Sequence, residues 1–369
     1  MRKMLIFLLM LPLLFCTDIK AHAAESYDYG RAALEDAVPP EAAEILEEQG
    51  VTPDNSGAGS LSFQGVLEYL WSIIYEQLTG PLRLLVSLCG IILLCGLSAG
   101  VSDNSADKLS GLFTTVGVLA GAGMTVAAIS EILTSSLQLL KTASIFITAF
   151  IPIFAGVLSV MGRTASASAI NAITLAATQL FSQLAVNFLA PLCGAIMGLS
   201  ITGAIHPQLN ISRLGELIKK IVIWVLSLLM TVFMSILSVQ TFVTSSADSV
   251  LIRTAKFAVS SGVPIIGGTI SDAVGTVHSS LAVIKSSVGT YGIIAAAVII
   301  LPTLINVACY RLAVSAAEAV SDVFGVKELS SLLKSCGAVM SIIIAVIVCF
   351  LLLNTIAAVI MLAIGNGTA

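Results

Sequence analysis

Long apolar stretches separated by short polar connections dominate the chain. Hydrophobic runs occupy residues 82–101, 112–133, 143–161, 169–189, 192–205, 221–243, 288–309 and 339–364. Most of them have the ~20 residues that a helix needs to cross the hydrocarbon core of a bilayer. In the strands of a membrane barrel, apolar and polar residues would alternate with a period of two, and the residues of these runs do not alternate in this way. The pattern predicts an all-α, polytopic membrane bundle with six to eight spans.

The two runs on either side of Pro191 leave the span count open. They predict either one kinked span followed by a half-helix, or a tight hairpin. Cations do not fix the orientation of the spans, because they occur in almost every connection. These are Arg163, Arg213, Lys219, Lys220, Arg253, Lys256, Arg311 and Lys334.

The start of the chain has the order typical of secretory signal peptides. Basic residues 2–3 precede an apolar core at 4–15, and the small-x-small triplet AHA ends at Ala23. This order predicts a signal peptide at residues 1–23. An uncleaved first span is the alternative, although the twelve apolar residues at 4–15 are short for a bilayer.

Residues 24–80 form an acidic region. They contain eleven Asp and Glu residues against the single cation Arg31, a net charge of −10, whereas residues 81–369 carry thirteen Lys and Arg against nine acids. Such a negative segment opposes binding to nucleic acid or anionic lipid. If the signal peptide is cleaved, this region lies outside the cytoplasm.

An amphipathic helix is expected at the end of the acidic region. Leu67, Leu70, Trp71 and Ile74 recur at helical spacing, with glutamates elsewhere on the wheel. The pattern predicts a helix on the membrane surface before the first span. A short soluble helix that packs on a partner is the alternative.

Two segments align without gaps at an offset of 112 residues. KTASIFITAFIPIFAGVLS, from Lys141, matches RTAKFAVSSGVPIIGGTIS, from Arg253, at six identical positions. A second proline follows Pro152 after 39 residues and Pro264 after 38 residues. This similarity predicts an internal duplication. Chance similarity in a chain rich in small residues is the alternative.

These observations predict the domain organisation. A signal peptide and an acidic extracytoplasmic segment with an amphipathic helix precede a polytopic membrane domain that contains two repeats and a last span. The predicted boundaries are 1–23, 24–80 and 81–369, with repeats at about 103–212 and 213–325 and the last span at 339–364.

Prolines inside the apolar segments are candidate broken-helix positions: Pro152, Pro191, Pro264 and Pro302. Proline removes a backbone donor, so in lipid it needs neighbouring helices or a wet cavity. Interrupted segments at matching positions of two halves indicate a solute site or conduit, with structural kinks as the alternative. The cations beside these segments are expected at the membrane interface: Lys141, Arg253 and Lys256.

A polar stripe marks one side of the predicted helix at 169–189. It consists of Asn171, Thr174, Thr178, Gln179 and Ser182. Such a stripe either lines a hydrated conduit or supplies hydrogen bonds between packed helices. Four ionisable residues lie in or beside apolar runs: Glu131, Asp248, Asp272 and Lys285. Each either couples or gates a transport process or lies at the membrane interface, where a span ends.

Composition strengthens the membrane assignment. Hydrophobic residues make up 57% of the 369 residues and charged residues 10%, which is far from a typical soluble domain. Small residues are abundant, and GLSAG, GVLAG and GAIMG provide small-xxx-small contacts for closely packed helices.

Residues that could carry catalytic chemistry are sparse. The seven cysteines form no CxxC pair, the three histidines are scattered, and no GxxxxGK[ST] loop is present. No carboxylate pair, activated nucleophile or metal-ligand cluster recurs at a useful spacing. The sequence therefore predicts a non-enzymatic protein without a cofactor, a metal site or a nucleic-acid partner.

VLIRTAKFAVSSGVPIIGGTISDAVGTV, from Val250, preceded by SILSVQ, from Ser235, resembles the stage III sporulation protein AE family of endospore-forming Firmicutes. The likeness extends from the signal peptide to the last span and is sharpest over residues 211–290. The order of signal peptide, acidic lead and polytopic body agrees with it.

The resemblance implies a subunit of the multiprotein channel, akin to a secretion apparatus, that joins the mother cell to the engulfed forespore. It implies a place in the mother cell membrane facing the forespore and a need for the protein in late forespore development. The implied partners are the other stage III sporulation A-operon proteins and stage II sporulation protein Q. A secondary transporter with its site at the paired Pro-broken segments is the alternative, and a purely structural anchor is a third.

Overall fold

The computed structural model describes residues 31–48, 50–53, 63–100, 107–205, 211–262 and 267–364. Within these ranges the chain is helical apart from short turns, which confirms the all-α prediction. The helices are α2 (Arg31–Asp36), α3 (Pro40–Glu48), α4 (Phe63–Gln77), α5 (Thr79–Gly100), α6 (Asp107–Val160), α7 (Thr164–Leu184), the π-helical turn η1 (Ala185–Leu189), α8 (Ala190–Ile205), α9 (Ile211–Gly262), α10 (Gly267–Val323) and α11 (Lys327–Ala363).

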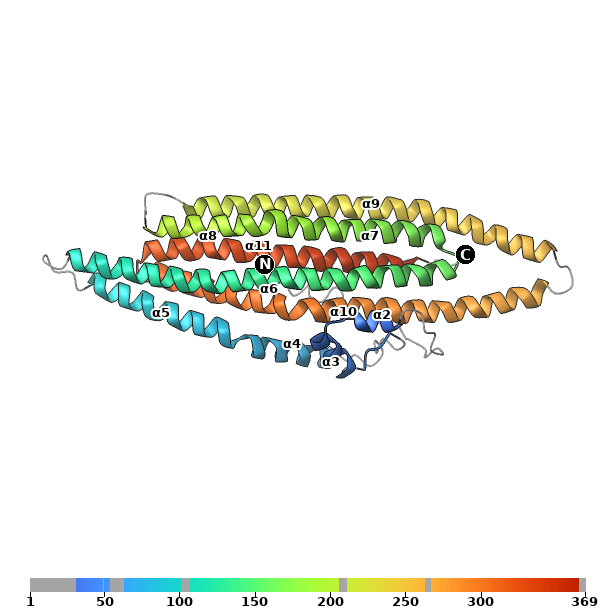
Figure 1. Cartoon of the computed structure of the whole chain (residues 1–369), viewed down its shortest axis with the longest axis horizontal. Helices are drawn as coiled ribbons and strands as arrows, with labels where there is room; N and C mark the ends of the chain where they lie inside the picture. Colours follow the sequence, from blue (N-terminus) through green and yellow to red (C-terminus); the bar gives the residue numbers. More distant parts are fainter. Residues whose placement is uncertain are drawn as a thin grey trace.

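Helices α5 to α11 form an elongated bundle of antiparallel passes, with α7, η1 and α8 joined into one pass (Figure 1). Among the described residues, six segments are long and apolar enough to cross a membrane. They are Thr79–Leu97, Thr115–Val160, Thr164–Gly203, Arg213–Val250, Lys285–Val323 and Lys327–Ala363. The chain is therefore a multi-pass membrane protein, as its apolar runs predict.

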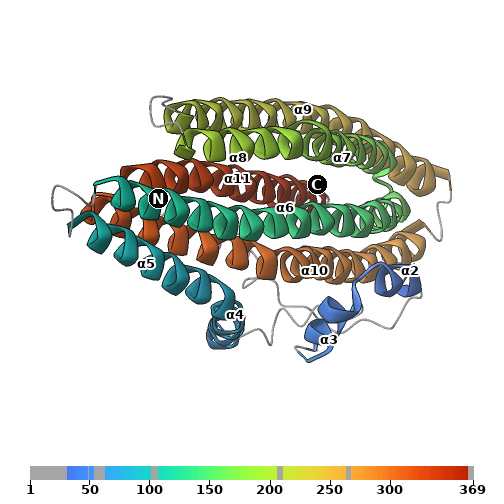
Figure 2. The same cartoon turned by 60° about the vertical axis from the view of Figure 1, so that its left-hand side comes forward.

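The last helix, α11, is the centre of the bundle. It packs against α6, α7, α8, α9 and α10, and it lies between the other passes in Figure 2. Of the most apolar 18 consecutive residues of α11, 67% are buried, against 22% of the corresponding 18 residues of α9. α11 thus forms the core, whereas α9 presents most of its apolar surface to the outside.

Two tight turns reverse the chain between long helices, and each uses a glycine. Gly162 (φ 81°) joins α6 to α7, and Gly325 (φ 73°) joins α10 to α11. After each glycine a backbone N–H reaches back five residues, from Arg163 to the Leu158 carbonyl and from Val326 to the Ser321 carbonyl, both at 3.0 Å. This is the Schellman arrangement, which needs a left-handed residue that glycine adopts without strain.

The chain continues through Pro191 without reversing, so the hairpin alternative at this proline is wrong. Proline has no N–H and its ring clashes with the carbonyl four residues earlier. The π-helical turn η1 directly precedes this position, and there the Ala190 N–H bonds to the Ala185 carbonyl, five residues back. A widened turn is a known way for a helix to absorb such a clash.

The predicted amphipathic helix is present as α4, and it packs on this chain's own α10. Ile73 is buried against Leu301 and Ile305 of α10, while Trp71 and Tyr75 are 70% and 77% exposed. The acidic helix α3 also contacts α10, and α2 contacts α6. The amino-terminal helices therefore cover one side of the bundle (Figure 1).

Several predictions lie outside the described residues. The signal peptide at 1–23 and Pro264 are among them. The first of the two similar segments runs uninterrupted inside α6, whereas the second covers the end of α9 and the start of α10. The internal duplication therefore stays a prediction.

Candidate functional site

The polar stripe lies on α7, and its members have different surroundings. Thr174 and Thr178 are fully buried. Asn171 and Ser182 are half-buried, and Gln179 is exposed. The structure therefore brings only part of the predicted stripe into the interior of the bundle.

A hydrogen bond links the stripe to the central helix. The Thr178 hydroxyl donates to Asn354 Oδ1 of α11 at 3.2 Å, and Asn354 Nδ2 donates to the Phe350 carbonyl at 2.8 Å. One turn along, the rings of Phe181 and Phe350 lie with centroids 5.8 Å apart. Thr178 thus provides a contact between helices. Asn354 was not singled out from the sequence, although a lone asparagine in an apolar span is a usable signal.

We expect Thr178 and Asn354 to be energetically coupled. In a double-mutant cycle with Thr178→Val and Asn354→Leu, the coupling should be about 0.5–1 kcal/mol, because hydrogen bonds between membrane helices average near the lower value. The free energy of unfolding of the purified protein in detergent would be measured. Strictly additive effects of the two substitutions would contradict the contact.

Asp248 of α9 caps the start of another helix. Its two carboxylate oxygens accept hydrogen bonds from the Ala165 and Ser166 backbone N–H groups, each at 3.0 Å. Asp248 is fully buried. The first N–H groups of a helix have no partner within it, and the helix dipole favours a negative charge there. This carboxylate therefore holds α7 against α9.

Lys285 of α10 has the complementary role at the end of α11. Its Nζ donates to the carbonyl of Ile364, the residue that follows the last turn of α11. A cation near a helix C-terminus is favoured by the dipole and satisfies a carbonyl that lacks an intrahelical partner. Arg163 lies beside Asp248 and donates to Ser249 Oγ at 3.4 Å. Two of the ionisable residues noted in the sequence thus bind helix ends.

The other ionisable candidates have different places. Glu131 and Lys141 are exposed on α6. Arg253 and Lys256 belong to the last part of α9, and Asp272 to the start of α10. The interfacial place predicted for the three cations stays a prediction.

The described prolines are spread along the bundle. Pro152 is exposed inside α6, Pro302 is half-buried inside α10, and Pro191 follows η1. Gly292 of α10 lies against Phe150, two residues from Pro152. Pro302 is ten residues farther along α10, about 15 Å away at the rise of an α-helix. The structure therefore does not bring Pro152 and Pro302 together.

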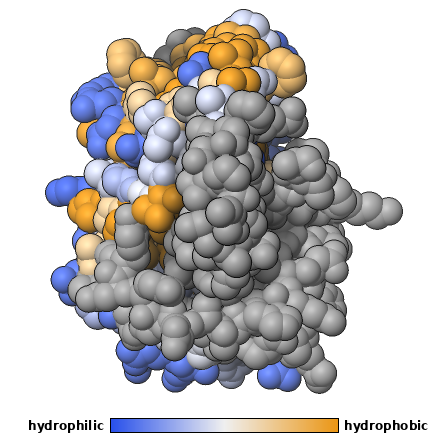
Figure 3. Space-filling view, turned by 90° about the vertical axis from the view of Figure 1, so that its right-hand side faces the viewer, coloured by the Kyte–Doolittle hydropathy of each residue, from blue (hydrophilic) through white to orange (hydrophobic). Residues whose placement is uncertain are grey.

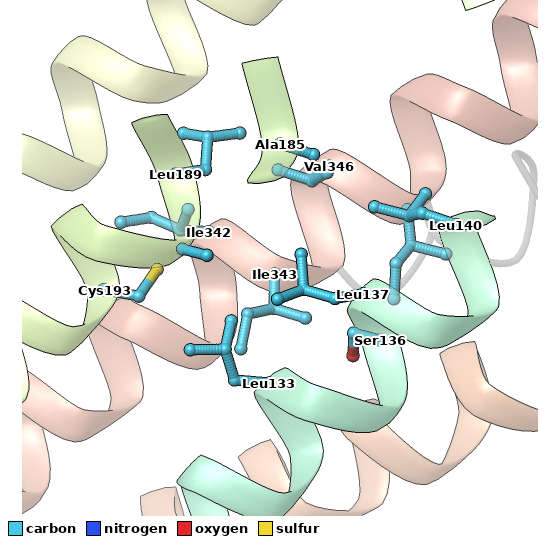
Figure 4. Close-up of a pocket in the computed structure, with 12 residues that line it drawn as sticks. Leu133, Ser136, Leu137, Leu140, Ala185, Leu189, Cys193, Ile342, Ile343 and Val346 are labelled. Carbon is cyan, nitrogen blue, oxygen red and sulfur yellow. The ribbon is translucent and has the colours of Figure 1, made fainter. Parts of the chain in front are cut away.

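A small pocket of about 20 Å³ opens beside η1 (Figure 4). Its walls come from α6, from η1 and α8, and from α11. The lining is apolar apart from Ser136, whose hydroxyl donates to the Ile132 carbonyl at 2.7 Å. Such a small pocket has no charge or free donor that would recognise a polar solute.

The glycine motifs divide into two kinds. Gly96 lies directly against Phe324 in the turn after α10, and Gly117 and Gly121 lie against side chains of neighbouring helices. A Cβ atom added at Gly194 or Gly198 would meet nothing within 4 Å. GLSAG and GVLAG thus serve close packing within the chain. In the part of the chain that the structure describes, no group of three His, Cys, Asp or Glu residues could hold a metal ion.

The long apolar helices, the central α11 and the capped helix ends define a polytopic helical membrane protein. The chain belongs to the stage III sporulation protein AE family, whose model matches residues 48–365. It is therefore a sporulation protein with several membrane-length helices.

A curated relative supports the family assignment. Stage III sporulation protein AE of Bacillus subtilis (strain 168) is 28% identical over 244 residues, which cover 64% of this chain and 60% of the relative. The match thus spans about three fifths of the relative's length. No solved structure matches the chain.

Proposed function

We propose that the chain is a non-enzymatic membrane subunit of the channel or export apparatus that connects mother cell and forespore, and that late forespore development requires it. Family membership supports the role in sporulation. The six membrane-length helices support a place in the membrane, which we assign to the mother cell membrane facing the forespore. The proposed partners are the other stage III sporulation A-operon proteins and stage II sporulation protein Q.

The length of the apolar helices is the observation that carries this proposal. Five of the six candidate spans of the described residues contain 37 to 46 residues, each around a strongly apolar stretch of 18 residues. At the rise of an α-helix, even 37 residues extend about 55 Å, whereas the hydrocarbon core is ~30 Å thick. Tilt accommodates part of such an excess, at a cost that grows with the mismatch.

The outer face of α9 shows most clearly that apolar surface extends beyond the thickness of the bilayer core. Large apolar side chains are exposed along it from Leu214 to Val250, a length of about 54 Å. In the end view, hydrophobic residues gather at the top, where α9 lies in Figure 1, and hydrophilic residues at the bottom edge (Figure 3). An apolar surface longer than the bilayer needs protein to cover the remainder. A subunit of a membrane assembly meets that need.

The transporter alternative has less support. The pocket beside η1 has an apolar lining. The pairing of the segments of Pro152 and Pro264 stays a prediction, because Pro264 lies outside the described residues. A purely structural anchor remains compatible with the helix lengths. The experiment below separates a required sporulation subunit from a dispensable protein.

Deleting the coding sequence in the organism that encodes the chain should block sporulation after engulfment, and an intact copy should restore it. The readouts are the stage reached by forespores under the microscope and the number of heat-resistant spores. A Gly194→Ala copy, altered at an open surface position, is the matched control and should also restore it. Normal spore numbers in the deletion strain would contradict the proposal.

A further inference from the structure

Three polar atoms on one side of α7 are buried without a hydrogen-bond partner. They are Ser166 Oγ, Asn171 Oδ1 and Thr174 Oγ1. Ser166 and Thr174 are fully buried as whole side chains. The three residues lie between the Asp248 cap at the start of α7 and the Thr178 hydrogen bond to Asn354. Three of the buried unpaired polar atoms of the described residues therefore lie within one stretch of a membrane helix, and others lie on α4, α10 and α11.

Several buried hydroxyls of the described residues are satisfied within their own helix, whereas the hydroxyl of Thr174, like those of Thr290 and Thr355, is not. Thr125 donates to the Gly121 carbonyl at 2.7 Å, and Ser200 donates to the Ile196 carbonyl at 2.6 Å. Both bonds reach four residues back within the same helix. Thr174 makes no such bond, so its hydroxyl needs another partner, because buried polar groups are almost always hydrogen-bonded.

The chemistry of this stretch fits water better than an ion. Asn171, Thr174 and Ser166 offer neutral oxygens, and both Asp248 oxygens already accept backbone N–H groups. Arg163 and Lys285 lie at the same end and near enough to interact electrostatically, so a cation would be repelled. Buried water typically joins two to four polar groups of this kind.

We propose that internal water molecules occupy a seam along α7, bound by Ser166, Asn171 and Thr174. The seam begins beside the Asp248 cap, and the Thr178–Asn354 hydrogen bond closes its inner end. From Ala165 to Thr178 it extends about 20 Å along the helix. Water is thereby brought next to the central helix α11. This inference concerns the folded chain itself and does not depend on the proposed role in sporulation.

Radiolytic oxidation of single cysteines in the purified full-length protein tests the seam. Hydroxyl radicals form from internal water itself, so no reagent has to enter. In a background whose native cysteines are replaced by alanine, Thr174→Cys should oxidise about tenfold faster than Ile170→Cys, because a dry apolar contact supplies no water. Ile170 is fully buried on the same helix, one turn away. Equal rates at the two positions would overturn the proposal.

A second pair of variants tests the water ligand without moving the reporter. With the single cysteine at Asn171→Cys, adding Thr174→Val should lower the oxidation rate several-fold, because valine keeps the shape and removes the hydroxyl. Thr125→Val is the matched control, since its buried hydroxyl is already bonded within its own helix, and it should leave the rate unchanged. An unchanged rate with Thr174→Val in a folded protein would also overturn the proposal.

Discussion

Replacing Asp248 with alanine is expected to lower the free energy of unfolding by about 2–4 kcal/mol, which combines the loss of a helix cap with two charge-assisted hydrogen bonds. Both oxygens of this buried carboxylate accept backbone N–H groups at the start of α7. Without it those groups lose their partners inside the bundle, and α7 loses its anchor to α9.

The change would be measured as a shift in the denaturation midpoint of the purified protein in detergent micelles. Asp248→Asn keeps one side-chain oxygen, so its denaturation midpoint should lie between those of Asp248→Ala and the native protein. Ser246→Ala, an exposed position whose hydroxyl bonds back to the Phe242 carbonyl, is the control and should stay within about 0.5 kcal/mol. A native midpoint for Asp248→Ala would show that the cap does not stabilise the fold.

Gly292→Ala is expected to be the second most damaging substitution, at about 1–3 kcal/mol for overpacking of a close contact. A Cβ atom at Gly292 would lie 2.0 Å from Phe150 Cε2. A Cβ atom at Gly289, one turn earlier, would lie 2.5 Å from Leu362 and 2.7 Å from Phe154. The glycines let α10 approach α6 and α11 at the core of the bundle.

A compensating substitution tests whether the ring causes the loss. Phe150→Leu shortens the side chain, so the Gly292→Ala, Phe150→Leu double variant should lose less stability than the sum of the two single variants. Gly198→Ala faces open space and should be neutral or stabilise the helix by about 0.5–1 kcal/mol. Equal losses for Gly292→Ala and Gly198→Ala would contradict the close contact.

The apolar runs predicted much of this fold, because the length of an apolar run limits what it can form in a membrane. The six membrane-length helices found among the described residues fall within the predicted range. The runs at 112–133 and 143–161 proved to be one helix, since Glu131 and Lys141 are exposed on its surface and do not interrupt the backbone ladder. Within α6, these two charges thus mark exposed positions and do not mark the end of the helix.

The partners of individual side chains could not be predicted from local sequence. Thr178 and Asn354 are 176 residues apart in the chain, and Asp248 lies 82 residues from Ser166. Which helices meet, and at which register, is decided by packing around α11. The polar stripe was recognisable as a pattern, but its division into a contact with Asn354 and a set of unpaired atoms depends on that register.

Photo-cross-linking from the outer face of α9 in sporulating cells tests the central claim most directly. A photoreactive amino acid would replace Trp224 or Phe242, which are 66% and 78% exposed, with the fully buried Phe154 as the control position. If the chain works as a subunit of a membrane assembly, at least one outer position should form a covalent adduct with another protein, and Phe154 should form none. Adducts with lipid alone at both outer positions, from a chain recovered as a lone monomer, would contradict the account.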